Sequence, residues 1–95
     1  MTQRPAVIKH KGPFFVYMVR CSRGTLYTGY TNDLDNRLKL HNSGRGAKYL
    51  RGRAPVRLVY LKKYRIYQSA LAAEREIKKL TRPQKEQLIM GTHRS

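Results

Sequence analysis

Carboxylates are scarce in this chain, which has only five Asp and Glu residues among 95. Asp33 and Asp35 stand at the start of a predicted helix, where capping and the helix dipole account for them. Glu86 lies among basic and polar residues near the end of the chain. Glu74 and Glu76 therefore remain as the acidic side chains that could take part in chemistry.

Glu74 borders the apolar stripe of its predicted helix, whereas Glu76 is turned towards Lys79. An ion pair with Lys78, one helical turn further on, would account for Glu74 without any function. The alternative is a metal site, because a hard cation such as Mg²⁺ can be held by one carboxylate together with waters and phosphate oxygens. A phosphodiesterase with a single Glu ligand is therefore physically possible.

Arg37 and His41 supply other groups that phosphodiester hydrolysis needs. On the predicted helix, His41 follows Leu34 and Leu38 along one face, and Arg37 falls on the edge of that face. Arg37 could bind a phosphate oxygen, and His41 or a tyrosine could move a proton. Because the reference pKa of tyrosine is near 10, we expect the cations of this basic site to lower it.

Two tyrosines lie on predicted strands at residues 14–20 and 26–30, which are rich in aromatic and β-branched residues. Turn residues separate the strands, so the pair predicts an antiparallel hairpin. We expect the hydroxyls of Tyr17 and Tyr27 to point into one shared cleft. Gly29 is unusual inside a strand: either it marks the close approach of another group, or it simply ends the strand.

Asn32 can cap a helix that ends at residues 42–44. Residues 45–55 carry four cations and show no clear period, which predicts either a loop that follows a phosphate backbone or a solvated loop. Residues 56–64 predict a third strand with Val56, Leu58 and Tyr60 on one face.

Two further helices are predicted at the end of the chain. Residues 69–80 have an apolar stripe, and "TRPQ" at 81–84 is a capping box that begins a last helix, which runs to about Met90. The order of elements favours a small three-stranded sheet flanked by helices. We divide the chain into a flexible basic arm at 1–13, one domain at 14–90 and a tail at 91–95.

Lys and Arg total 21, so the formal net charge is +16. Such an excess favours binding to polyanions, and nucleic acid is the first candidate. A membrane partner is disfavoured because neither a basic amphipathic helix nor an apolar run of roughly 18 residues is present.

Cys21 is the only cysteine, which excludes an intramolecular disulfide and a thiolate zinc site. It suits a reducing cytosol, and the amino terminus lacks the apolar core of a signal peptide, so we expect a cytoplasmic protein.

Taken together, several segments resemble the GIY-YIG nuclease superfamily, and in particular its small single-domain bacterial subgroup. "FVY" at 15–17 and "YTG" at 27–29 are similar to the two motif triplets, and "TNDLDNRLKLHNSG" is similar to the family's helix with its Arg and His. "GAKYLRG", "PVRLVY" and "SALAAEREIKKLTRPQKEQLI" are similar to the later segments of the subgroup. Phe15 stands where the family's name has Gly, and Thr28 replaces the apolar middle residue of the second triplet.

The resemblance implies an α+β fold with a central three-stranded antiparallel sheet flanked by helices. It also implies cleavage of phosphodiester bonds with one divalent cation, Mg²⁺ or Mn²⁺. By this resemblance Glu74 is the metal ligand and Arg37 steadies the scissile phosphate. The other catalytic positions are Tyr17, Tyr27, Gly29 and His41, and the expected substrate contacts are Lys48, Tyr49 and Arg51.

Two functions follow as hypotheses. The first is a metal-dependent endonuclease that hydrolyses DNA, in repair or recombination. The second is a nucleic-acid-binding module, for DNA or RNA, with little or no catalysis, which rests on the charge and on the absence of a second, specificity-giving domain from this sequence.

Overall fold

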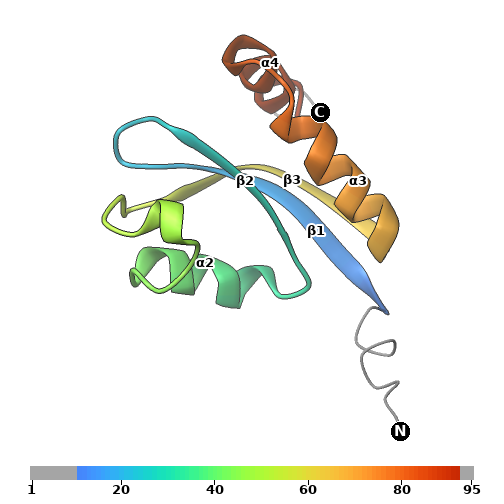
Figure 1. Ribbon diagram of the computed structural model, residues 1–95, viewed down its shortest axis with the longest axis horizontal. Helices are drawn as coiled ribbons and strands as arrows, with labels where there is room; N and C mark the ends of the chain where they lie inside the picture. Colours follow the sequence, from blue (N-terminus) through green and yellow to red (C-terminus); the bar gives the residue numbers. More distant parts are fainter. Residues whose placement is uncertain (1–10, 93–95) are drawn as a thin grey trace, which may run out of the picture.

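The computed structural model describes residues 11–92, which form an α+β fold around one three-stranded sheet (Figure 1). The sheet is antiparallel with the order β2-β1-β3, so β1 is the central strand. Its strands are β1 (Lys11–Arg20), β2 (Leu26–Thr31) and β3 (Arg57–Ile66). The helices are α2 (Leu34–Asn42), α3 (Tyr67–Lys78) and α4 (Arg82–Thr92), with a short 3₁₀ helix η1 at Lys48–Leu50. The predicted fold class is confirmed.

The ends of the domain differ from the predicted boundaries. Strand β1 begins at Lys11, so residues 11–13 belong to the sheet and not to the predicted arm. Residues 1–10 of that arm lie outside the described part of the chain. Helix α4 continues through Gly91 and Thr92, which were predicted to belong to the tail, and the remaining tail residues 93–95 also lie outside it. Within residues 11–92 no helix has the length and apolar character needed to cross a membrane.

Alternation along β1 divides the core into two clusters, one on each side of the sheet. Phe14, Val16 and Met18 pack with residues of α3 and α4. Tyr17 and Val19 point to the opposite side, where the apolar residues of α2 and Leu50 of η1 cover them. Figure 1 shows α2 and α3 on opposite sides of the sheet. Tyr17 therefore belongs to the α2 side, in keeping with the period of two along a strand.

A β-bulge changes which side of the sheet the residues of β3 face. Met18 pairs with Tyr60 while the next residue, Val19, pairs with Leu58, so Val59 is an extra residue in β3. Beyond the bulge the alternation is reversed: Tyr60 lies in the α3-side cluster and Val56 in the α2-side cluster. The prediction that Val56, Leu58 and Tyr60 share one face was wrong for this reason.

The helix starts are set by local hydrogen bonds. Helix α2 is capped by Asp33, whose side chain accepts a hydrogen bond from the amide of Asn36, and not by Asn32 as predicted. The predicted capping box of α4 is confirmed, because Thr81 and Gln84 each accept a hydrogen bond from the other's amide. Residues 45–55 are not wholly irregular, since Leu50 is buried and anchors η1 against the sheet.

Helix α4 is tied to the β1–β2 hairpin through Glu86. Both carboxylate oxygens accept hydrogen bonds from the guanidinium of Arg20 at 2.8 Å, and one also accepts from Arg82 Nε at 2.9 Å. Arg82 in turn donates to the carbonyl of Gly24 in the hairpin turn. The hydrogen bonds from Arg20 and then Arg82 lower the pKa of Glu86 to about 2.

Candidate active site

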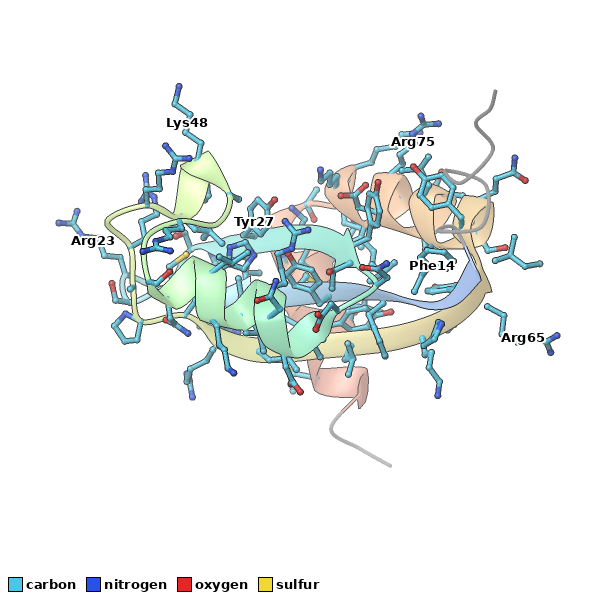
Figure 2. All side chains as sticks on the ribbon, turned by 90° about the horizontal axis from the view of Figure 1, so that it is seen from below. Phe14, Arg23, Tyr27, Lys48, Arg65 and Arg75 are labelled. Atoms are coloured by element: carbon cyan, nitrogen blue, oxygen red, sulfur yellow. The ribbon has the colours of Figure 1, made fainter. Side chains whose placement is uncertain are left out.

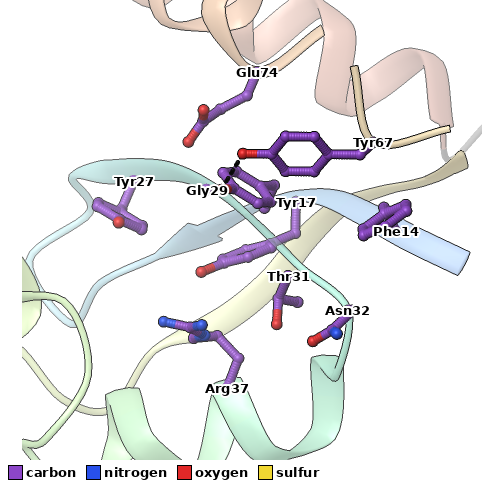
Figure 3. Close-up of a pocket in the computed structure, with 10 residues that line it drawn as sticks. Phe14, Tyr17, Tyr27, Gly29, Thr31, Asn32, Arg37, Tyr67 and Glu74 are labelled. Atoms are coloured by element: carbon purple, nitrogen blue, oxygen red, sulfur yellow. Dashed lines mark hydrogen bonds between the residues drawn. The ribbon is translucent and has the colours of Figure 1, made fainter. Parts of the chain in front are cut away.

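A cavity of about 480 Å³ opens where the edge strand β2 passes between α2 and α3 (Figure 3). Its wall comes from both sides of the sheet, because β2 has no neighbouring strand beyond it. The pocket is lined by Phe14, Tyr17, Tyr27, Gly29, Tyr30, Thr31, Asn32, Arg37, Tyr67 and Glu74. Four of the residues predicted from their chemistry (Tyr17, Tyr27, Arg37 and Glu74) therefore meet in one place, together with Gly29.

The two tyrosines are diagonal neighbours on adjacent strands. Tyr17 pairs with Gly29 and Val19 pairs with Tyr27, so both tyrosine side chains lie on the α2 side, with ring centroids 6.4 Å apart. A Cβ atom at Gly29 would lie 2.7 Å from the Tyr17 hydroxyl oxygen and 2.9 Å from Cζ. Gly29 thus provides the space for the Tyr17 ring. The close approach predicted for this glycine exists, and the group that approaches is Tyr17 itself.

Arg37 and Glu74 enter the pocket from opposite sides, Arg37 from α2 and Glu74 from α3 (Figure 3). The Glu74 side chain is 12% exposed, and its Oε2 lies 3.2 Å from Lys78 Nζ. The predicted ion pair with Lys78 is therefore confirmed, and Glu74 also lines the pocket, while its role as a metal ligand stays a prediction. Glu76 is different, because its side chain is 76% exposed and pairs with Lys79 at 3.7 Å.

His41 does not line the pocket but lies behind Tyr17. It is fully buried, and its Nε2 is 2.9 Å from the Tyr17 hydroxyl oxygen. Its other ring nitrogen, Nδ1, accepts a hydrogen bond from the amide of Ala47 at 3.2 Å. The Tyr27 ring packs edge-on against the imidazole, with centroids 5.7 Å apart. His41 therefore contacts two pocket residues, Tyr17 and Tyr27, without lining the pocket itself.

The electrostatics of Tyr17 differ from the prediction. Burial raises the pKa of Tyr17 well above its usual value, and the neighbouring Tyr27 and Glu74 raise it further. Arg37 acts in the predicted direction and lowers this pKa, but its effect is smaller than that of burial. Burial and the charge of Arg37 also lower the pKa of His41. In the protein alone, Tyr17 therefore keeps its proton and His41 is neutral at pH 7.

The residues predicted as substrate contacts lie beside the pocket and do not line it. Lys48 and Arg51 are exposed at the two ends of η1. Tyr49 is 47% exposed, and its ring stacks on that of Tyr27 with centroids 6.1 Å apart and 19° between the planes. Figure 2 shows Lys48 and Arg75 extending to the same side of the molecule, with Tyr27 between them.

The pattern of these positions agrees with the comparison to known proteins, in which residues 13–87 match the GIY-YIG catalytic domain. The chain belongs to the GIY-YIG family.

Relatives within this GIY-YIG family are close. The UPF0213 protein CPE1444 of Clostridium perfringens is 53% identical over 79% of this chain and 81% of its own length. The UPF0213 protein HQ_3675A of the archaeon Haloquadratum walsbyi is 51% identical over 78% of this chain and 83% of its own length. A solution NMR structure of EF2693 from E. faecalis superimposes with a TM-score of 0.63 and 41% identity, covering 90% of this chain and 92% of that one.

Several pocket residues were missed by reasoning from the sequence. The Tyr30 and Tyr67 hydroxyls are 3.2 Å apart, and Phe14 packs edge-on against Tyr67. Alternation along β2 places Tyr30 on the α3 side, opposite Tyr27, so an analysis of one sheet face omits it. Strand β2 is an edge strand, and a pocket over such an edge receives side chains from both faces of the sheet.

The donor atoms in the GIY-YIG pocket suit one hard divalent cation. No group of three or more His, Cys, Asp or Glu side chains that could hold a metal is found among residues 11–92, so a closed transition-metal site is not present there. Glu74 Oε2 is paired with Lys78, and within the same described range Oε1 has no hydrogen-bond partner. One carboxylate in a pocket with room for water fits Mg²⁺ or Mn²⁺, which retain several water ligands.

Proposed function

We propose that this chain is a nuclease that uses one divalent cation to hydrolyse phosphodiester bonds in DNA. The observation that supports this most strongly is the meeting of Arg37 and Glu74 from two different helices over the same pair of tyrosines. A positive group, a metal-binding carboxylate and two hydroxyls in one pocket match the needs of phosphate chemistry. Structural packing alone would not require this combination in a chain with so few carboxylates.

Glu74 would hold the cation, with the remaining ligand positions open to water and to phosphate oxygens. When bound, the cation would offset the negative charge that develops on the phosphate during attack. The Glu74 side chain suits this role because the ordered helix α3 supports it and burial restricts its motion. Its partner Lys78 is half exposed, so this lysine can swing into solvent when a cation binds.

Other residues of the pocket would bind the phosphate and transfer the proton. Arg37 binds a non-bridging oxygen of the scissile phosphate. Tyr17, which keeps its proton, donates a hydrogen bond to the phosphate or to the attacking water. Tyr27, once its own hydroxyl proton has been released to solvent, would take the proton from that water through its phenolate oxygen as the water attacks phosphorus. The P–O bond to the leaving group breaks, and the leaving oxygen is protonated from solvent.

DNA would approach from the side of the molecule on which Lys48 and Arg75 extend. These two cations flank Tyr27 in Figure 2, and Arg51 adds a third charge at η1. A single strand that crosses the edge of β2 between η1 and α3 would bring one phosphate into the pocket. Contacts of this kind do not depend on base sequence, and binding should weaken steeply with salt.

The test is cleavage of labelled single-stranded, duplex and branched DNA with Mg²⁺ or Mn²⁺, before and after chelation. Glu74→Gln keeps the size of the side chain and removes its charge, and we expect cleavage to fall by more than roughly 100-fold, beyond what outer-shell partners of a metal cost. Glu76→Gln, two residues away on the same helix, is the matched control and should cleave at the wild-type rate.

A nucleic-acid-binding module without catalysis is the second candidate, and the formal net charge of +16 is the observation that favours it. It predicts DNA binding that survives Glu74→Gln together with no cleavage by the wild type in either metal. Equal cleavage by wild type and Glu74→Gln would contradict the proposed nuclease.

A further inference from the structure

Three neighbouring groups surround the His41 imidazole, two through hydrogen bonds and one through close packing. Its Nδ1 accepts from the amide of Ala47, and its Nε2 faces the Tyr17 hydroxyl at 2.9 Å. The third contact is with Gly46, where an added Cβ would overlap Nδ1 and come within 2.9 Å of Cε1. The imidazole therefore lies directly against the backbone of residues 46–47.

The chain reaches this position because it reverses sharply after α2. Gly44 adopts a positive φ of 82°, and the amide of Arg45 bonds back to the carbonyl of Leu40. This is the usual way in which a left-handed residue ends a helix. The reversal brings the backbone of residues 46–47 over the side chain of His41, and the buried Leu50 then fixes η1 against the sheet.

The amide of Ala47 decides which nitrogen of His41 carries the proton. An amide N–H can only donate, so Nδ1 must present its lone pair to it. In neutral His41 the proton is then on Nε2, and Nε2–H is the donor in the hydrogen bond to Tyr17. An imidazolium would direct a second N–H at the Ala47 amide, which disfavours the charged form.

We propose that the Gly46–Ala47 backbone makes His41 a hydrogen-bond donor to Tyr17, and that this directs the Tyr17 proton into the pocket. Accepting from His41 occupies one lone pair of the Tyr17 oxygen and leaves its O–H free to donate to the phosphate or the attacking water. His41 is thus a positioning residue that acts through Tyr17, and it does not accept a proton from it. The consequence for cleavage rests on the nuclease function proposed above.

The first test needs no DNA. Two-bond ¹H–¹⁵N correlation spectra of the full-length protein at neutral pH report which imidazole nitrogen carries the proton, and the signal that disappears in His41→Gln identifies His41. We expect Nε2 to be protonated and Nδ1 to be bare. A proton on Nδ1, or on both nitrogens, would overturn the proposal whether or not the protein cleaves DNA.

The second test compares isosteric replacements in the cleavage assay. The amide of His41→Gln can donate from near the Nε2 position, so this variant should stay within a few-fold of the wild type. His41→Glu can only accept there and would turn the Tyr17 O–H away from the pocket. His41→Asn keeps an acceptor for Ala47 but cannot reach Tyr17. We expect these two variants to fall by about 10- to 100-fold, the scale of misplaced or unsupported active-site groups.

The comparison of His41→Gln with His41→Glu separates donation from proton transfer. Higher activity in His41→Glu than in His41→Gln would mean that His41 takes a proton, and the proposal would fail. Because a buried Glu can also impair folding, circular dichroism of each variant accompanies the assay, and the Gln–Asn pair gives the same discrimination without a charge.

Gly46→Ala tests the backbone contact itself. The added methyl group must displace the His41 ring, so the ¹⁵N pattern of His41 should change and cleavage should fall by about the same factor as in His41→Asn. Gly91→Ala is the matched control, because a Cβ there meets nothing within 4 Å. An unchanged His41 spectrum in Gly46→Ala would contradict the proposed role of this backbone.

Discussion

Glu74 and Glu86 lie on successive helices and are surrounded in opposite ways. Glu86 has both oxygens engaged by Arg20 and a further bond from Arg82, and it joins α4 to the hairpin. Glu74 has one ion pair, to a half-exposed lysine, and its side chain lines the pocket. Both are partly buried acids in a strongly basic chain, yet Glu86 is paired with two arginines and Glu74 with a half-exposed lysine.

The difference shows how a structural carboxylate can be told from a candidate functional one in this fold. The chain has 21 Lys and Arg residues and only 5 Asp and Glu residues, so there are enough cations for every glutamate to pair with two of them. Glu74 instead lines a pocket with Arg37, Tyr17 and Tyr27 and has a half-exposed lysine as its ion-pair partner, which is the setting expected of a functional group. Three measurements would sharpen or break this contrast.

The largest effect on stability is expected at Glu86. Glu86→Gln loses the charge-assisted bonds to both arginines, and we expect the free energy of unfolding to fall by about 1–2 kcal/mol after allowance for solvent exposure. Urea denaturation would measure it. Glu74→Gln, the counterpart in the comparison, should change stability by less than about 0.5 kcal/mol. Equal losses in the two variants would remove the distinction.

Acid should weaken the same contact. The pKa of Glu86 is about 2, below its ordinary value of 4.5, so its contribution is complete above pH 4.5 and is lost as the pH falls towards 2. We expect the difference in unfolding free energy between the wild type and Glu86→Gln to shrink over this range. A difference that stays constant from pH 5 to pH 2.5 would show that the carboxylate charge is not what holds α4.

The smallest effect is expected from freeing Glu74. Lys78→Met removes the cation that competes for its carboxylate, at a stability cost below about 0.5 kcal/mol. Binding of Mn²⁺, measured by calorimetry, should strengthen by up to about fivefold, the range of a weak exposed ion pair. Lys79→Met, which breaks only the pair with Glu76, serves as the control. If both variants bind Mn²⁺ as the wild type does, Lys78 does not restrain the site.

The elements of this fold could be predicted because their signals are local. Alternation marks the strands that carry Tyr17 and Tyr27, and the capping box marks the start of α4. The choice of Glu74 over Glu76 was made through the family resemblance, because helical geometry favours Glu74 without deciding between the two.

The parts that could not be predicted depend on long-range packing. No sequence signal indicates that Val59 is an extra residue in β3, yet because of it Val56 and Tyr60 lie on opposite sides of the sheet. Burial decides the pKa of Tyr17, and a count of nearby cations gives the wrong sign. The sequence does not distinguish Gly46 from other loop glycines, because its contact with His41 depends on the reversal of the chain after α2.

Residues of β1, β2, α2 and α3 line the pocket, and the order of these elements along the chain has a consequence for biosynthesis. A chain growing from its amino terminus acquires both tyrosines and Arg37 early, but Glu74 follows only after β3 has been made. Strand β3 pairs with β1, and α3, which follows β3 directly, contacts all three strands of the sheet. With the proposed activity, a nascent chain that lacks α3 has no metal ligand in the pocket, and it would not cut DNA until α3 lies against the sheet.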